Sequence, residues 1–301
     1  MQVPGFASRL TRESPGRSHP ANGWLKLVAM LTQPELAELR EVVRLVATEE
    51  LMTRFRRVDA STKRDGSVIT EADLAMQRRL QAELGKRWPA FALLGEEMDQ
   101  ATQQQLLHTP GAGLWCLDPL DGTSNFAAGI PFFAVSLALI VDGEIDAGIV
   151  YDPVRDECFS ALSGSGAWQD DHRLQPPPMP KTLADAMAIV DLKRLPPELI
   201  RVLATHAPYR SQRSFGSVAL DWCWIACGRC HIYLHGGQKL WDYAAGRLIL
   251  QESGGSGGVL DRYGGDWLTE LSLQPRIAMA AGDAGLLHQW RGWIDAAVTK
   301  G

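Results

Sequence analysis

Apolar and polar residues near the start of the chain follow a helical period. In residues 31–57, "LTQPELAELREVVRLVATEELMTRFRR", apolar residues recur at spacings of three and four. Pro34 lies in the first turn, and Thr32 or Gln33 stands at the capping position. This pattern predicts an amphipathic helix.

A second helix is predicted from about Thr70 to Arg87. The segment before it, "TKRDGSVIT", has a turn signal at Asp65-Gly66 followed by a few residues typical of extended chain. Thr70 followed by Asp73 resembles a capping box with a shorter acid, which favours a helix start at this point.

The period then changes to that of strands. Two short apolar runs, "FALLGEEMD" at 91–99 and "LWCLDPLDGTSNF" at 114–126, each end in acidic residues. From Phe132 to about Trp168 the pattern predicts an antiparallel meander, with a hairpin at Asp142-Gly143.

A proline-rich connector, "LQPPPMPK" at 174–181, separates this part from one in which strands and helices alternate. We therefore predict a mixed α+β and α/β protein, in which an antiparallel N-terminal sheet precedes an alternating C-terminal part. The predicted units are a poorly ordered tail at 1–32, a subdomain at 33–178 and a subdomain at 179–301. Strands are expected in 186–191, 212–217, 230–236 and 275–282, and helices in 196–208, from Val218, in 240–255 and in 284–300.

Composition narrows the class of protein. The chain has 301 residues, is 46% hydrophobic and carries a net charge of −5, which disfavours non-specific binding to nucleic acid. No apolar run approaches the roughly 18 residues that span a bilayer. Residues 1–32 lack the apolar core of a signal peptide, so we expect a cytoplasmic protein; a transit peptide or an over-extended start is the alternative for this tail.

Three of the five cysteines, Cys223, Cys227 and Cys230, have the spacing of an iron–sulfur motif. The competing interpretation is a buried helix, on which spacings of four and three place all three thiols on one face. We favour the helix, because a cluster-binding triad belongs in a loop where three sulfurs can converge.

Acidic residues recur where strands end, most notably Asp118 and Asp121. Two carboxylates at the mouth of a buried strand repel each other unless a cation neutralises them, and oxygen ligands suit Mg²⁺. Gly122 allows a ligand to approach the backbone, while Thr123 and Ser124 are placed to cap a helix whose N–H groups would attract phosphate. Together these features indicate metal-assisted hydrolysis of a phosphate ester.

Three motifs in order resemble the inositol monophosphatase family: "GEE" at 95–97, "DPLDGTSNF" at 118–126 and "WDYAAGRLILQESGG" at 241–255. The resemblance implies an αβαβα sandwich, a homodimer, lithium sensitivity and two or three Mg²⁺ ions. The implied metal ligands are the carboxylates of Glu96, Asp118, Asp121 and Asp242 and the carbonyl of Leu120.

The same resemblance implies roles for other residues. Thr123, with Glu96, would orient and deprotonate the attacking water, and Asp73 would lie near the water shell of a third ion. Contacts to the substrate are implied for Gly122, Thr123, Ser124, Gly216, Ser217 and Val218. Where the family has a glutamate that binds ring hydroxyls this chain has His235, which either contacts the alcohol or only packs at the strand end.

The predicted function is hydrolysis of a small phosphorylated alcohol, by default an inositol-1-phosphate-like ester, through a metal-activated water. Fructose 1,6-bisphosphate, histidinol phosphate and 3′-phosphoadenosine 5′-phosphate are alternative substrates. A weakly active family member that serves as a regulatory binding protein is the alternative from another class. We expect neither a nucleic-acid polymer nor a membrane as partner.

Overall fold

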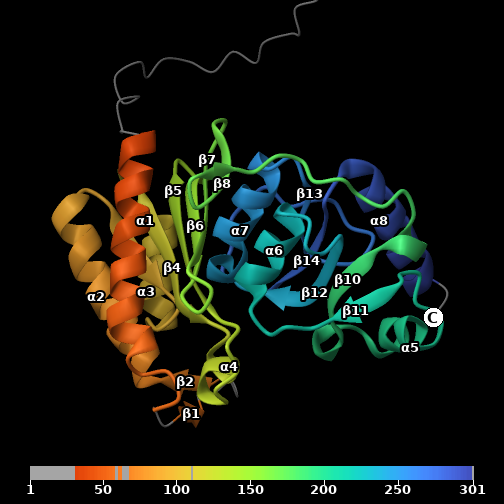
Figure 1. Cartoon of the computed structure of the whole chain (residues 1–301), viewed down its shortest axis with the longest axis horizontal. Helices are drawn as coiled ribbons and strands as arrows, with labels where there is room; N and C mark the ends of the chain where they lie inside the picture. The colour runs from red at the N-terminus through yellow and green to blue at the C-terminus, as the bar shows by residue number, and fades with distance from the viewer. Residues whose placement is uncertain (1–30, 58–59, 63–67, 110, 300–301) are drawn as a thin grey trace, which may run out of the picture.

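The computed structural model describes residues 31–57, 60–62, 68–109 and 111–299. The predicted turn at Asp65-Gly66 and most of the tail predicted at 1–32 lie outside these ranges. The described residues fold into five stacked layers of helices and sheets, which run from left to right in Figure 1.

The first layer is helical: α1 (Gln33–Ala47), α2 (Glu71–Arg87) and α3 (Gln100–His108). Thr32 and Glu35 form a capping box on α1, as Thr70 and Asp73 do on α2, which confirms both predicted helix starts. The predicted first helix changes character at Thr48 and continues as a π-helical segment, η1 (Thr48–Met52). The short helix α3 was not predicted.

The second layer is a sheet of seven described strands in sequence order. Its members are β3 (Ala92–Gly95), β4 (Leu114–Asp121), β5 (Ala134–Val141), β6 (Glu144–Asp152), β7 (Glu157–Leu162), β8 (Gly166–Gln169) and β9 (His172–Arg173). β3 and β4 are parallel and the remaining pairs are antiparallel, so the predicted meander is confirmed. Asp142 and Gly143 both have positive φ, as a tight hairpin turn requires. Beside the short helix α4 (Thr123–Ala127) lies a small ribbon of β1 (Ala60–Thr62) and β2 (Val68–Thr70).

The fourth layer is a five-stranded sheet in the order β11-β10-β12-β14-β13. Its strands are β10 (Met187–Asp191), β11 (Ser211–Arg213), β12 (Ile232–Gln238), β13 (Ser256–Leu260) and β14 (Arg276–Ala281). β13 was not predicted, because its two glycines disfavour a strand when only local sequence is considered. A side chain at Gly257 would approach the carbonyl oxygen of Met279 to 2.5 Å, so the close pairing of β13 with β14 requires a small residue.

Helices α6 (Val218–Ala226) and α7 (Leu240–Glu252) form the third layer between the two sheets, while α5 (Pro197–His206) and α8 (Ala284–Thr299) cover the far side of the second sheet (Figure 1). This arrangement confirms the predicted αβαβα sandwich.

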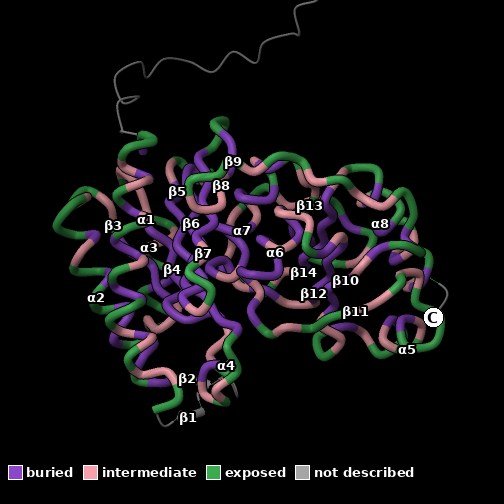
Figure 2. Tube along the Cα trace, in the orientation of Figure 1, coloured by how far each residue is buried: buried purple, intermediate pink, exposed green. Residues whose placement is uncertain are grey.

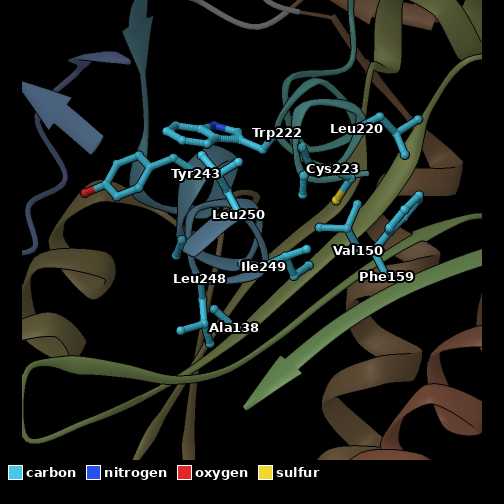
Figure 3. Close-up of a cluster of buried hydrophobic side chains, with 14 of the residues drawn as sticks. Ala138, Val150, Phe159, Leu220, Trp222, Cys223, Tyr243, Leu248, Ile249 and Leu250 are labelled. Carbon is cyan, nitrogen blue, oxygen red and sulfur yellow. The ribbon is translucent and has the colours of Figure 1, made fainter. Parts of the chain in front are cut away.

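The layers are held together by three buried apolar clusters, seen as purple stretches in Figure 2. Alternation along single strands supplies both neighbouring clusters. Ile232 and Leu234 of β12 face α5 and α8, whereas Tyr233 faces α6 and α7. The central cluster, drawn in Figure 3, packs Trp222 of α6 and Tyr243 of α7 between the two sheets.

The helix predicted for the three spaced cysteines is only partly correct. Cys223 lies within α6 and is fully buried, but Cys227 is the C-terminal cap and Cys230 lies beyond the helix. The three thiols therefore do not share one helical face. Burial raises the pKa of each of these thiols, as expected of cysteines that serve as packing residues.

Candidate active site

β4 ends in Asp118 and Asp121, and the structure turns both toward the same side of the sheet. Residues three apart on a regular strand would point to opposite faces. Here Asp118 pairs with Ser136 and Asp121 with Ala134, so three steps along β4 oppose two along β5. This one-residue bulge lies between Asp118 and Asp121, a segment that includes Pro119, which has no N–H to donate to a partner strand, and it brings the two carboxyl groups to one face.

The carboxylate of Asp121 is held by the start of α6. Ser217 donates its hydroxyl to Oδ2 at 2.5 Å, and the backbone N–H of Ala219 donates to the same oxygen at 2.8 Å. The N–H of Val218 donates to Oδ1 at 3.2 Å. The predicted substrate contacts Ser217 and Val218 therefore bind the Asp121 side chain in this structure, and their contact with substrate stays a prediction.

Asp242 lies in the first turn of α7, and its Oδ2 accepts the backbone N–H of Lys239 at 2.8 Å. The helix start is tied to the first sheet, because the hydroxyl of Ser136 donates to the carbonyl of Trp241 at 2.9 Å. Ser136 is also the cross-strand neighbour of Asp118. One hydroxyl thus fixes the position of Asp242 relative to Asp118, and the neighbouring Trp241 is buried in the apolar core.

Glu96 follows β3 and is positioned by two glutamines from neighbouring helices. Gln103 of α3 donates its Nε2 to the carbonyls of Gly95 and Glu96 at 3.0 and 3.1 Å. Gln77 of α2 accepts the N–H of Glu97 at 3.2 Å. Neither glutamine was predicted from the sequence, since neither lies in a recognised motif.

Thr123 and Asp73 meet across 50 residues of sequence. The Thr123 hydroxyl lies 3.1 Å from Asp73 Oδ1 and 2.8 Å from the carbonyl oxygen of Leu120. The other oxygen of Asp73 accepts from both the N–H and the hydroxyl of Thr70, at 2.7 and 2.6 Å. Burial raises the pKa of Asp73, and these hydrogen bonds act against the rise.

The expected helix after the second acid exists as α4 (Thr123–Ala127), but its start differs from the prediction. Gly122 occupies the capping position with φ of 90°, while Thr123 and Ser124 lie inside the first turn. An added Cβ at Gly122 would approach the carbonyl oxygens of Gly216 and Phe132 to 3.1 Å. The left-handed backbone and the close approach both require glycine here.

Burial, reinforced by the crowding of acids, governs the electrostatics of this region. Burial raises the pKa of Asp118 well above its usual range, and the charges of Glu96, Asp121 and Asp242 add to the effect. Burial raises the pKa of Asp121 to about 6 although the hydrogen bonds from α6 act against it. Burial and the charges of Glu96 and Asp121 raise the pKa of Asp242 well above its usual range. Acids arranged in this way require positive charge to stay ionised.

The donor chemistry of this group fits a hard divalent cation, since all four side chains offer carboxylate oxygen. Within the described ranges, however, no three Asp, Glu, His or Cys side chains lie close enough together to form a complete ligand set. The three aspartates and Glu96 are near enough for their charges to raise the pKa values of the aspartates, while a shared metal site and the assignment of individual ligands stay predictions.

On the alcohol side of the predicted site, His235 is buried and has protein partners on both ring nitrogens. Its Nδ1 accepts the N–H of Gly237 at 3.2 Å, and its Nε2 lies 3.1 Å from Oδ2 of Asp191 at the end of β10. Asp191 was not predicted from the sequence as a residue of the site.

A family model described as the inositol monophosphatase family matches residues 32–292, most of the chain. The chain belongs to the inositol monophosphatase family. Members of this family are metal-dependent phosphatases that hydrolyse phosphomonoesters, so the predicted family and enzyme class are both confirmed.

The curated relatives of this chain include proteins with two different names. Inositol-1-monophosphatase of Mesorhizobium japonicum is 35% identical over 203 residues, which cover 66% of this chain and 74% of the relative. Nus factor SuhB of Pasteurella multocida is 34% identical over 237 residues, which cover 74% and 84%.

Solved structures share the fold. An IMPase of Thermotoga maritima superimposes with a TM-score of 0.74 at 27% identity, over 89% of this chain and 99% of that one. An IMPase/NADP phosphatase complexed with Mg²⁺ and phosphate superimposes with a TM-score of 0.70 at 24% identity, over 86% and 92%. No helix within the described ranges has the length and apolar character needed to cross a membrane.

Proposed function

We propose that this phosphatase hydrolyses a small phosphorylated alcohol, with an inositol-1-phosphate-like ester as the reference substrate, and that it uses two or three Mg²⁺ ions. The proposal is carried by the placement of the acids: a bulge in β4 turns Asp118 and Asp121 to one face, and Ser136, which is opposite Asp118, holds the helix start that carries Asp242. Burial and the neighbouring charges, including that of Glu96, raise the pKa values of these three aspartates. Bound Mg²⁺ would supply the positive charge that stabilises these acids and activates phosphate and water.

The chain's own groups would then orient the reactants. Thr123 Oγ1 is within reach of Asp73 Oδ1, so this pair is placed to orient the attacking water and to take up its proton. Burial raises the pKa of Asp73, which makes its carboxylate a stronger base than a solvated aspartate. The backbone N–H groups of Gly122 and Thr123, and the exposed Ser124, are proposed to hold the phosphate oxygens.

The test is release of phosphate from a panel of esters, namely inositol 1-phosphate, fructose 1,6-bisphosphate, histidinol phosphate and 3′-phosphoadenosine 5′-phosphate. We expect turnover in Mg²⁺, no turnover after chelation, recovery when Mg²⁺ is restored, and inhibition by lithium. Turnover that persists in excess chelator would refute the proposed use of metal.

A second candidate function is regulatory, because several relatives that are 31–34% identical carry the name Nus factor SuhB. In this alternative the chain acts as a binding protein with weak activity. A stable complex with a protein partner, together with negligible turnover on every ester, would favour it. We also propose that the protein forms a homodimer, that it is cytoplasmic and that its two subdomains meet at 178/179. Analytical ultracentrifugation, cell fractionation and limited proteolysis, in that order, would test these three points.

A further inference from the structure

On the predicted alcohol side of the site, His235 of β12 lies beside a carboxylate from the neighbouring strand β10, that of Asp191. Burial lowers the pKa of His235, so its ring is neutral near pH 7, with Nε2–H facing Asp191 and Nδ1 occupied by Gly237. The hydrogen bond from His235 lowers the pKa of Asp191, so the carboxylate is anionic. His235 therefore acts here as a support for Asp191.

Asp191 in turn pairs with Arg194. The two belong to the junction of β10 with the short helix η3 (Leu192–Arg194), and Arg194 Nε lies 3.5 Å from Asp191 Oδ2. The Arg194 side chain is 56% exposed, and no described residue accepts a hydrogen bond from its terminal nitrogens. Its guanidinium is thus anchored on one edge and available to a ligand on the other.

Gly236 lets η3 lie directly against β12. An added Cβ at Gly236 would lie 1.8 Å from the carbonyl oxygen of Arg194, a distance that no side chain tolerates. The absence of a side chain at this position therefore sets the place of Arg194 near the end of β12, in the segment that leads into α7 and Asp242.

One oxygen joins the guanidinium to the predicted alcohol side. Oδ2 of Asp191 lies 3.1 Å from Nε2 of His235 and 3.5 Å from Nε of Arg194. Lys239, a cation at the start of α7, donates its Nζ to the carbonyl of Leu273 at 3.2 Å. Arg194 is consequently an accessible positive charge beside His235, the residue at the predicted contact with the alcohol portion of an ester.

We propose that Arg194 is a specificity-determining residue, held by Asp191 and Gly236, that selects phosphate esters whose alcohol portion carries a second anionic group. A guanidinium presents a planar fork of donors that matches phosphate and carboxylate. An ester with a cationic alcohol portion, such as histidinol phosphate, is disfavoured by the same charge. This inference rests on the proposed phosphatase function.

The test uses matched pairs of esters that differ in the second anion: glycerol 2-phosphate with 2-phosphoglycerate, and fructose 1-phosphate with fructose 1,6-bisphosphate. We expect the wild-type protein to prefer the more anionic member of each pair. Arg194→Gln should reduce the ratio of kcat/KM between members about tenfold, the loss expected for one hydrogen bond to a charged group. The change should appear in KM, because binding of the second anion is the same before and during reaction.

Lys193→Gln is the matched control, because this neighbouring cation is also exposed and its loss should leave the ratio unchanged. Gly236→Ala should displace Arg194 and reduce the ratio in the same direction. If Gly236→Ala does not fold, Arg194→Gln decides alone.

Three outcomes would overturn the inference. A wild-type protein without preference for the more anionic member, or an Arg194→Gln variant that loses activity equally on both members, refutes the role of Arg194 and leaves the phosphatase function intact. If no ester is hydrolysed in Mg²⁺, the proposed function fails and the inference fails with it.

Discussion

The contact between α6 and α7 offers a sharp test of how packing sets the active site, through the substitution Gly246→Ala. Gly246 is buried in the middle of α7, where it faces Trp222 of α6. Alanine is the better helix former by about 0.8–1.0 kcal/mol, so a helix considered alone would be stabilised by this change.

In the folded protein, contacts around Gly246 make the same substitution destabilising. The added Cβ would lie 2.6 Å from Cβ and 2.9 Å from Cγ of Trp222, which are the stem of that side chain and cannot turn away. Trp222 is also fixed by its Nε1–H, which donates to Gln238 at 3.0 Å. Overpacking of a core costs about 1–3 kcal/mol, so Gly246→Ala should destabilise the protein by about 1 kcal/mol net.

The matched control is Gly292→Ala in α8, where an added Cβ meets no atom within 4 Å. This variant should gain nearly the full helix-propensity term of about 0.5–1 kcal/mol. In thermal unfolding, Gly292→Ala should raise Tm and Gly246→Ala lower it, each by about 2 °C per kcal/mol for a chain of this size.

Activity separates the two variants further. The start of α6 holds Asp121 and the start of α7 carries Asp242, so a forced separation of these helices should reduce kcat/KM at a temperature where the variant is still folded. An increase in Tm for Gly246→Ala equal to that of Gly292→Ala would show that the packing argument is wrong.

Three further predictions follow from single side chains. Asp118→Asn should reduce kcat at least about 100-fold, with an unchanged circular dichroism spectrum, because it removes one acid from the coupled group; retained turnover in Mg²⁺ would contradict the site. Ser217→Ala removes the hydroxyl that donates to Asp121 and should raise the Mg²⁺ concentration for half-maximal activity about tenfold; an unchanged Mg²⁺ dependence would argue against that role. Burial raises the pKa of Asp221 well above its usual range, so the folded state binds its proton more tightly than the unfolded state, and stability should fall as pH rises from about 4, the unfolded pKa, toward the folded pKa. The Tm of Asp221→Asn minus that of the wild type should therefore increase between pH 5 and pH 8, and a difference that stays constant over this range would contradict the argument.

The sequence by itself determined the secondary elements and the chemistry of the acidic motifs. Capping at Thr32 and Thr70 and the turn at Asp142-Gly143 depend on neighbours within four residues, so a local pattern is sufficient to predict them. Where local preference opposed the structure, as in glycine-containing β13, prediction from sequence failed.

Tertiary structure alone decided how the acids and their supports meet. The bulge that brings Asp118 and Asp121 to one face depends on the register with β5, and Ser217 reaches Asp121 across 96 residues of sequence. His235 has the sequence position of a substrate contact, but its partner Asp191 comes from a different strand. Hydrophobic period specifies which face of an element is buried, whereas register and long-range pairing are set only when the faces pack against each other.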